Sequence, residues 1–196
     1  FIKVEALDVL CEVIYENNAT GQQVLSEIQR LTDLGMEGKL SLKESLTKRI
    51  DLLQANRDHL GRIIADLKNK VSESVVRNRN FFKQHADNIY IISNGFKEII
   101  IPIVQEFGIK ADHVLANTFR FDHEGKIIGF DEKDELCENQ GKVKKIKSLN
   151  LQGDAFMIGD GYTDYETLKG GVVSKFYAFT ENVTRAIVVE NTDRHA

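Results

Sequence analysis

Apolar residues in the first third of the chain recur every three or four positions. This spacing predicts amphipathic helices, the first of them carried by Val4, Leu7, Leu10, Cys11 and Ile14. Similar spacing predicts helices around 24–31 and 60–67. Ser41 and Glu44 form a capping-box pattern at the start of a further helix. The stretches 17–21 and 35–38 are expected to separate these pieces.

From about Val71 the pattern changes to alternating helices and strands. The expected order is a helix near 73–84, a strand at 89–92, a helix at 96–107, a hairpin around 122–125, a helix near 141–149, a strand at 155–158, a short helix from 164, a strand at 176–179 and a helical turn at 183–187. Pro102 should kink or weaken its helix, and Gly108 should end it. Strand–helix alternation predicts an α/β fold with a parallel sheet and helices on both faces.

Composition narrows the class of protein. The chain has 196 residues, 42% of them hydrophobic, which is enough for a sizeable core. A net charge of −4 argues against a nucleic-acid partner, which needs a concentrated basic patch. No stretch approaches the ~18 apolar residues of a membrane span, so no membrane partner is expected. Cys11 and Cys137 have no metal-binding spacing and are typical of a reducing, cytoplasmic location.

Two carboxylates follow the apolar run Phe156–Ile158. The run ends at Gly159, and Asp160 and Asp164 come next, four residues apart. A buried strand that delivers acids at its carboxyl end is where open α/β sheets place their chemistry. Hard oxygen ligands of this kind suit Mg²⁺, which takes one or two carboxylates plus phosphate oxygens. The alternative is an ordinary turn, with Asp and Gly chosen for its geometry.

Other residues have the chemistry of a phosphate site. Ser93, Asn94 and Gly95 follow the strand at 89–92 and open a helix. A hydroxyl, a glycine and the amides of a helix N-terminus suit an anion, although a serine there is also a common N-cap. Lys142 begins the helix before the acidic strand. It could reach a phosphate as a point charge, or it could be a surface lysine of a lysine-rich helix.

Taken in this order, the three motifs resemble signature motifs of the haloacid dehalogenase (HAD) superfamily. The helical first third resembles the superfamily's cap. The segment 35–39, with Met36-Glu37-Gly38, the downstream Arg49 and also Glu5 resemble its phosphoserine phosphatase branch. The resemblance covers essentially the whole chain. It implies a Rossmann-like core over 71–196, a small helical cap over 1–70, and a first core strand upstream of residue 1.

For the core, the resemblance implies a role for each motif residue. Ser93 would hold the phosphoryl oxygens beside the amide of Asn94 or Gly95, and Lys142 would neutralise the phosphate. Asp160 would ligate Mg²⁺. Asp164 would support Lys142 and the waters of the metal, and Thr163 would hydrogen-bond near the phosphate.

For the cap, the resemblance implies recognition of an amino acid. Glu5 would receive the ammonium of the substrate, Arg49 would receive its carboxylate, and Met36 would pack over its stem. Each has a plainer alternative: a first-turn helix acid, a surface arginine and a core filler.

Some residues depart from the family pattern. Asn94 stands where many relatives have glycine, Thr163 where some have asparagine, and Leu42 where phenylalanine is frequent. The family's Asp-x-Asp-x-Thr motif, with the nucleophile and the general acid, would end immediately before Phe1.

The implied activity is Mg²⁺-dependent hydrolysis of L-phosphoserine through an aspartyl-phosphate, the last step of serine biosynthesis. A monomer or homodimer is expected, and a fused domain beyond Ala196 is an open expectation. The alternatives are a phosphatase for another small phosphomonoester, or a non-catalytic phosphate-binding or regulatory domain without the nucleophile.

Overall fold

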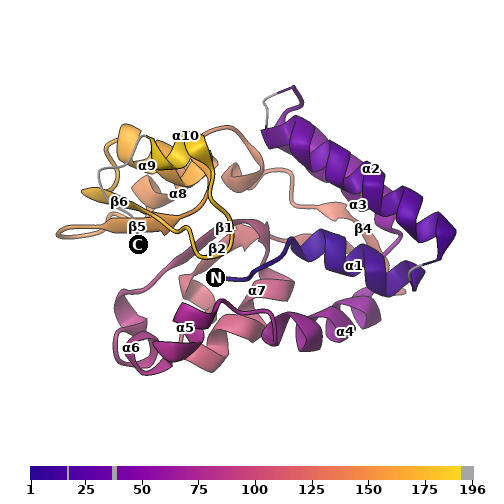
Figure 1. Cartoon of the computed structure of the whole chain (residues 1–196), viewed down its shortest axis with the longest axis horizontal. Coiled ribbons are helices and arrows are strands. Elements are labelled where there is room, and N and C mark those ends of the chain that lie inside the picture. The colour runs from indigo at the N-terminus through magenta and orange to yellow at the C-terminus, as the bar shows by residue number, and fades with distance from the viewer. Residues whose placement is uncertain (17, 37–38, 191–196) are drawn as a thin grey trace. The chain divides into compact units, whose positions relative to one another are not determined.

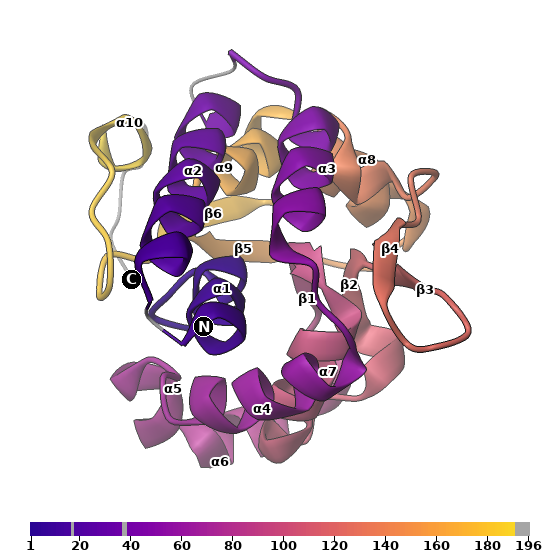
Figure 2. The same ribbon diagram turned by 90° about the vertical axis from the view of Figure 1, so that its right-hand side faces the viewer.

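The structure is a computed structural model that describes residues 1–16, 18–36 and 39–190 (Figures 1 and 2). It divides into two compact units, Phe1–Glu138 and Asn139–Ala196, and each is described by itself. The predicted cap and the first part of the predicted core both lie in the first unit. The cap boundary near residue 70 therefore stays a prediction.

The first unit opens with a layer of helices. They are α1 (Ala6–Tyr15), α2 (Ala19–Met36), α3 (Leu42–Leu53) and α4 (Arg57–Lys68). The capping box at Ser41 and Glu44 is confirmed. Val4 was expected in the first helix but lies before it and is exposed, because Glu5 has the extended backbone of an N-cap. Residues 19–21 and 35–36 were expected in connections and lie inside α2 instead.

The helix expected over 73–84 is two helices, α5 (Glu73–Arg77) and α6 (Arg79–Gln84). They meet at Asn78, whose side-chain nitrogen donates to the Ser74 carbonyl at 2.8 Å. An asparagine that bonds to nearby backbone competes with helix hydrogen bonds. The break therefore has a local cause.

The strands of the first unit form a parallel pair and a hairpin. β1 (Ile91–Phe96) pairs in parallel with β2 (Val114–Asn117), and between them α7 (Lys97–Val104) continues into the 3₁₀ turn η2 (Gln105–Phe107). The expected hairpin is confirmed as β3 (Phe119–Phe121) and β4 (Ile127–Phe130). The remaining 3₁₀ turns are η1 (Ala86–Asn88), η3 (Ala111–His113) and η4 (Glu135–Cys137).

The first strand and the helix after it differ from the prediction in their bounds. β1 begins at Ile91 and runs through Ser93, Asn94 and Gly95, so α7 starts at Lys97. The pairing with β2 shifts register between Ile92 and Phe96, which is how the polar triplet stays in the strand. The predicted stop at Gly108 is confirmed, since this glycine has φ 83°.

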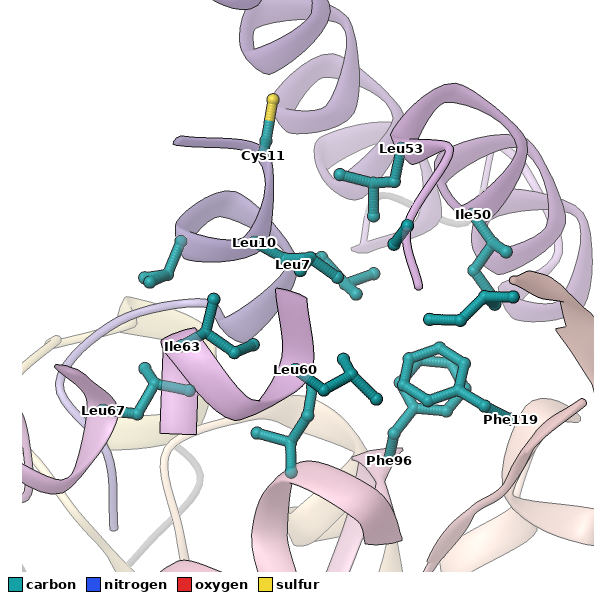
Figure 3. Close-up of a cluster of buried hydrophobic side chains, with 14 of the residues drawn as sticks. Leu7, Leu10, Cys11, Ile50, Leu53, Leu60, Ile63, Leu67, Phe96 and Phe119 are labelled. Carbon is teal, nitrogen blue, oxygen red and sulfur yellow. The ribbon is translucent and has the colours of Figure 1, made fainter. Parts of the chain in front are cut away.

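One hydrophobic cluster joins the helical layer to α7 and the hairpin (Figure 3). Its labelled members include Leu7, Leu53, Leu60, Phe96 and Phe119. The rings of Phe96 and Phe119 stack with centroids 3.7 Å apart. The helical layer and the α/β part of the first unit therefore share buried surface.

The chain enters and leaves the helical layer through paired segments. Ile2 and Val71 form an antiparallel bridge. The Ser72 amide donates to the Phe1 carbonyl at 2.9 Å, and the Lys3 amide donates to the Lys70 carbonyl at 2.9 Å. The Phe1 ring packs edge-on against Phe107. The two ends of the layer are thus fixed side by side.

The second unit also alternates helices and strands. Its order is α8 (Gly141–Ser148), β5 (Phe156–Gly159), α9 (Tyr162–Lys169), β6 (Lys175–Ala178) and α10 (Ala186–Val189). β5 and β6 are parallel, with Phe156 opposite Lys175 and Gly159 opposite Ala178. A small core of Phe176, Ala178 and Val188 lies beneath α9 residues Tyr165 and Leu168. Parallel strands and intervening helices in both units agree with the predicted α/β class.

Along the described residues, no helix combines the length and the apolar character needed to cross a membrane.

Candidate active-site residues

Lys142 and Asp164 form a buried ion pair in the second unit. Lys142 Nζ donates to Asp164 Oδ1 at 2.6 Å, and the side chains are 11% and 10% exposed. Lys142 lies in the first turn of α8, and Asp164 lies in the first turn of α9. The sequence separates them by 22 positions, and the fold brings them together.

The loop between β5 and α9 holds Asp164 in place. Its Oδ2 accepts a hydrogen bond from the Gly161 amide at 3.1 Å, in a capping-box arrangement. A side chain at Gly159 would collide with the Asp164 carboxylate. Glycine at 159 is therefore what allows this close approach between the strand end and the helix start. Thr163, in the same turn, is exposed.

Asp160 is half-exposed and pairs with Arg185. Nη1 of Arg185 contacts Asp160 Oδ2 and also donates to the Asp160 backbone carbonyl at 3.1 Å. Sequence reasoning missed Arg185, which directly precedes α10. Neither spacing nor a motif in the chain marked this residue.

The donor set fits a hard cation in part. Asp160 supplies carboxylate oxygens at the end of a parallel strand, and Mg²⁺ is usually held by one or two carboxylates with waters and phosphate oxygens. Among the described residues, no group of three or more His, Cys, Asp or Glu side chains is placed to hold a metal ion. Asp160 would therefore need oxygen ligands from substrate, water or another carboxylate.

Ser93, Asn94 and Gly95 form the polar last part of β1, before Phe96, in the first unit. The Gly95 amide donates to Ser93 Oγ at 3.0 Å, and the Asn94 carbonyl accepts from Asn117 Nδ2 at 2.8 Å. A Cβ on Gly95 would lie 3.2 Å from Ser93 Oγ, so a side chain there would crowd the hydroxyl. The hydroxyl and this amide thus face each other at the end of β1.

Several buried oxygens near this part of β1 have no hydrogen-bond partner among the described residues. They are Asn94 Oδ1, Asn117 Oδ1 and Glu98 Oε2. The other oxygen of Glu98 accepts from the Phe119 amide at 3.1 Å. Burial raises the pKa of the Glu98 carboxyl. Sequence reasoning missed Glu98 and Asn117, since each lies in an apolar segment without a motif.

Arg49 is buried within the helical layer. Its Nη1 donates to Thr32 Oγ1 at 3.0 Å, and its Nε donates to the Ser45 carbonyl at 3.3 Å. Burial lowers the pKa of Arg49, while the carboxylates of Glu5 and Asp8 act on that pKa in the opposite direction. The Glu5 carboxylate is therefore close enough to Arg49 for the two charges to interact. Asp8 was not singled out from the sequence, although it follows Glu5 by one helical turn.

Met36 and Leu42 are two further residues of the predicted cap. Met36 ends α2, but its side chain lies outside the described residues, as do Glu37 and Gly38. Leu42 begins α3 and packs, partly buried, against the main hydrophobic cluster.

The predicted site residues thus fall into two groups. Lys142, Asp160, Thr163 and Asp164 lie in the second unit, whereas Ser93–Gly95, Glu5 and Arg49 lie in the first. Their convergence on one site stays a prediction.

Comparison with known proteins decides the family. Residues 15–169 match the haloacid dehalogenase-like hydrolase family. The chain belongs to this family. The predicted HAD-like α/β class is confirmed by the same match.

Curated relatives of this family member are named phosphoserine phosphatase. The human protein is 29% identical over 193 residues, which cover 97% of this chain and 81% of the human one. The mouse protein is 30% identical over 171 residues, which cover 86% and 75%. A relative from Methanocaldococcus jannaschii is 27% identical and covers 74% and 69%. The family and these relatives place the chain among the phosphatases, as phosphoric monoester hydrolases.

Solved structures show the same architecture. A phosphoserine phosphohydrolase-like protein from Francisella tularensis superposes with a TM-score of 0.84 at 26% identity, covering all of this chain and 89% of that one. A phosphoserine phosphatase solved as a phospho-aspartyl intermediate analogue has a TM-score of 0.75 at 22% identity, with 98% and 86% covered. At that identity, the second likeness concerns the fold alone.

Proposed function

We propose that this protein hydrolyses L-phosphoserine to L-serine and phosphate with the help of Mg²⁺. The similarity to phosphoserine phosphatases supports the reaction class. One observation in the chain itself carries the substrate. A buried guanidinium, Arg49, lies within the electrostatic reach of the Glu5 carboxylate. An amino-acid substrate presents the complementary pair, a carboxylate and an ammonium.

The motif residues of the α/β part would hold the phosphoryl group. Lys142, fixed by Asp164 at 2.6 Å, would present its positive charge to the phosphoryl oxygens. The Ser93 hydroxyl, beside the amide of Asn94 or Gly95, would donate hydrogen bonds to them. Most of the catalysis of phosphoryl transfer lies in positioning and in charge stabilisation of this kind.

The covalent step needs an aspartate from the motif expected ahead of Phe1. Its carboxylate would attack phosphorus as the bond from phosphorus to the seryl oxygen breaks, and a second acid would protonate that oxygen. Water would then cleave the aspartyl-phosphate and release phosphate. Asp160 would hold Mg²⁺, which when bound neutralises charge on the phosphoryl oxygens.

The cap residues would select the substrate. Arg49 would receive the carboxylate, Glu5 the ammonium, and Met36 would lie against the stem. Interactions remote from the reacting phosphorus contribute to orientation as well as binding. The helical layer would also exclude water from the site. A cytoplasmic location and a role in serine biosynthesis belong to this proposal.

The test compares two substrates in a protein that carries the upstream motif. Arg49→Ala and Glu5→Gln should reduce kcat/KM for phosphoserine by about 30-fold or more, and should change hydrolysis of a generic aryl phosphate far less. Arg30→Ala, which removes an exposed arginine of the same layer, is the matched control and should leave both activities unchanged. Equal losses on both substrates would assign Glu5 and Arg49 to the fold.

Metal dependence is tested on the same protein. Asp160→Asn should lose most activity, and it should also weaken the binding of Mn²⁺ measured by electron paramagnetic resonance. Full activity in excess chelator would remove the metal from the proposal.

A phosphatase for another small phosphomonoester would show no preference for phosphoserine. A non-catalytic phosphate-binding domain would bind phosphate and hydrolyse neither substrate.

A further inference from the structure

Thr32 is a partly buried threonine of α2 that the proposed reaction leaves without a role. Its hydroxyl lies at the guanidinium of Arg49, where Oγ1 accepts a hydrogen bond from Nη1 at 3.0 Å. The same hydroxyl donates to the Ile28 carbonyl, one helical turn earlier, at 3.0 Å. A hydroxyl has a single hydrogen, so Thr32 presents the lone pairs of its oxygen to Arg49. Thr32 thus serves as an acceptor for a buried positive charge.

A second acceptor holds another part of the guanidinium. Nε of Arg49 donates to the Ser45 carbonyl at 3.3 Å, within α3. Ser45 is itself tied to α2, since its Oγ donates to the Leu31 carbonyl at 2.8 Å. The two helices approach closely here, because a Cβ on Gly35 would lie 3.1 Å from Ser45 Oγ. Arg49 therefore extends from a fixed contact between α2 and α3, and Thr32 of α2 bonds to its tip.

These two bonds leave part of the guanidinium available to a ligand. An arginine has five N–H donors, and Ser45 and Thr32 each take one of them. Within the described residues, Nη2 makes no hydrogen bond and is not fully buried, so its two N–H groups are available. A carboxylate is received best by N–H groups on two neighbouring nitrogens, which must point in the right direction. That direction depends on how the guanidinium is held.

We propose that Thr32 is a positioning residue, which holds the Arg49 guanidinium in the orientation that receives the carboxylate of the substrate. The inference rests on the proposed function, in which Arg49 binds that carboxylate. Without the Thr32 oxygen the bond at Nε would remain, but the Nη1 end would lose its acceptor. The entropy of ordering this long side chain would then be lost when the ligand binds, and the affinity for a carboxylate would fall.

The experiment measures the preference for a carboxylate in a protein that carries the upstream motif. This preference is kcat/KM for L-phosphoserine divided by kcat/KM for phosphoethanolamine, which has the ammonium but lacks the carboxylate. Thr32→Val has nearly the same shape but no hydroxyl, and it should lower the ratio about tenfold. Thr32→Ala also lacks the hydroxyl and is a good helix former, so it should show the same fall. Thr32→Ser keeps the acceptor and should keep most of the preference.

Thr47→Val is the matched control. Thr47 is a partly buried threonine of α3, and its hydroxyl donates to the Lys43 carbonyl at 2.9 Å, just as the hydroxyl of Thr32 donates one turn back. Within the described residues it makes no bond to Arg49, so Thr47→Val should leave the ratio unchanged. A double-mutant cycle adds a second check. In a protein that already carries Arg49→Ala, adding Thr32→Val should not lower the ratio further, because Thr32 acts through Arg49.

Three results would overturn the positioning role and leave the proposed function standing. They are an unchanged ratio in the Thr32 variants without a hydroxyl, an equal loss on both substrates with a lower thermal midpoint, and a fall of the same size in Thr47→Val. A further fall on adding Thr32→Val to Arg49→Ala would also overturn it. Retention of the preference in Arg49→Ala alone would overturn both the positioning role and the proposed recognition of the carboxylate.

Discussion

At the scale of single residues, two ion pairs of equal length differ in surroundings. Lys142–Asp164 and Lys110–Asp87 both have a nitrogen–oxygen distance of 2.6 Å. The first pair is buried, whereas the side chains of the second are 61% and 79% exposed. Water screens the charges of an exposed pair. A buried charge that loses its partner destabilises the folded state by its full free energy of desolvation.

We therefore predict that Asp164→Asn lowers the free energy of unfolding of the second unit by about 3 kcal/mol, since it leaves Lys142 buried and unpaired. Asp87→Asn, the control, should cause no measurable change. Urea denaturation of both variants measures the difference. Equal and small effects would mean that water reaches Lys142.

Glu98 gives a prediction about pH. Burial raises the pKa of its carboxyl above 4.5 in the folded protein. The stabilising contribution of the protonated acid is fully present below 4.5 and is lost as pH rises through the folded-state pKa. At neutral pH the buried Glu98 carboxylate therefore destabilises the folded protein.

Glu98→Gln should raise the thermal midpoint at pH 7, and the gain should shrink as pH falls towards 4.5. Glutamine retains an acceptor for the Phe119 amide, so the backbone contact is kept. Glu124→Gln, at an exposed position of the hairpin turn, is the control and should show no such pH dependence. A gain that is the same at every pH would point to packing rather than charge.

Residue chemistry was predictable where a motif carried it. Gly159, Asp160 and Asp164 are recognisable because a strand end, a turn and a helix start each constrain the residue type. Arg185 was not, because its partner Asp160 is brought near it only by the fold. A charge on an ordinary helix or loop has no local signature.

At the scale of elements, local signals predicted well and tertiary ones did not. The capping box of α3 was readable from Ser41 and Glu44, because both partners lie within one helical turn. The hairpin at 119–130 was also readable, because its two strands and the turn between them are consecutive in the sequence. The end of β1 was misplaced, since the polar triplet after Ile92 remains in the strand through its pairing with β2.

The N-terminal capping box of α3 yields a prediction. Ser41 Oγ accepts from the Glu44 amide at 3.2 Å, so Ser41→Ala should lower the free energy of unfolding by about 1 kcal/mol. The first turn of α3, the helix that carries Arg49, should also fray in this variant. The fraying should be visible as faster amide exchange in that turn. Ser26→Ala is the control, since Ser26 lies inside α2 and alanine is the better helix former. A loss as large for Ser26→Ala would show that the effect does not come from capping.

At the scale of the whole molecule, the helical layer is not an independent body in its packing. Leu53 from α3 and Leu60 from α4 lie in one cluster with Phe96 and Phe119. The sequence suggested a cap and a core as separate blocks, because the helical and alternating patterns change near residue 71. Hydrophobic contact does not follow that change of pattern, since α4 packs on α7. The second unit instead has its own small cluster, around Phe176.

This division predicts which elements lose stability together. Leu53→Ala removes a side chain that is 1% exposed and should destabilise the first unit by about 3 kcal/mol. Hydrogen exchange should then show faster exchange in α1, α4 and α7 together, with β5 and β6 unchanged. Phe176→Ala is the reciprocal variant, and it should release β5, β6 and α9 while the first unit keeps its protection. Loss of protection confined to α1–α4 in the first variant would mean that these helices open on their own. The shared cluster would then not join the helical layer and α7 into one cooperative unit.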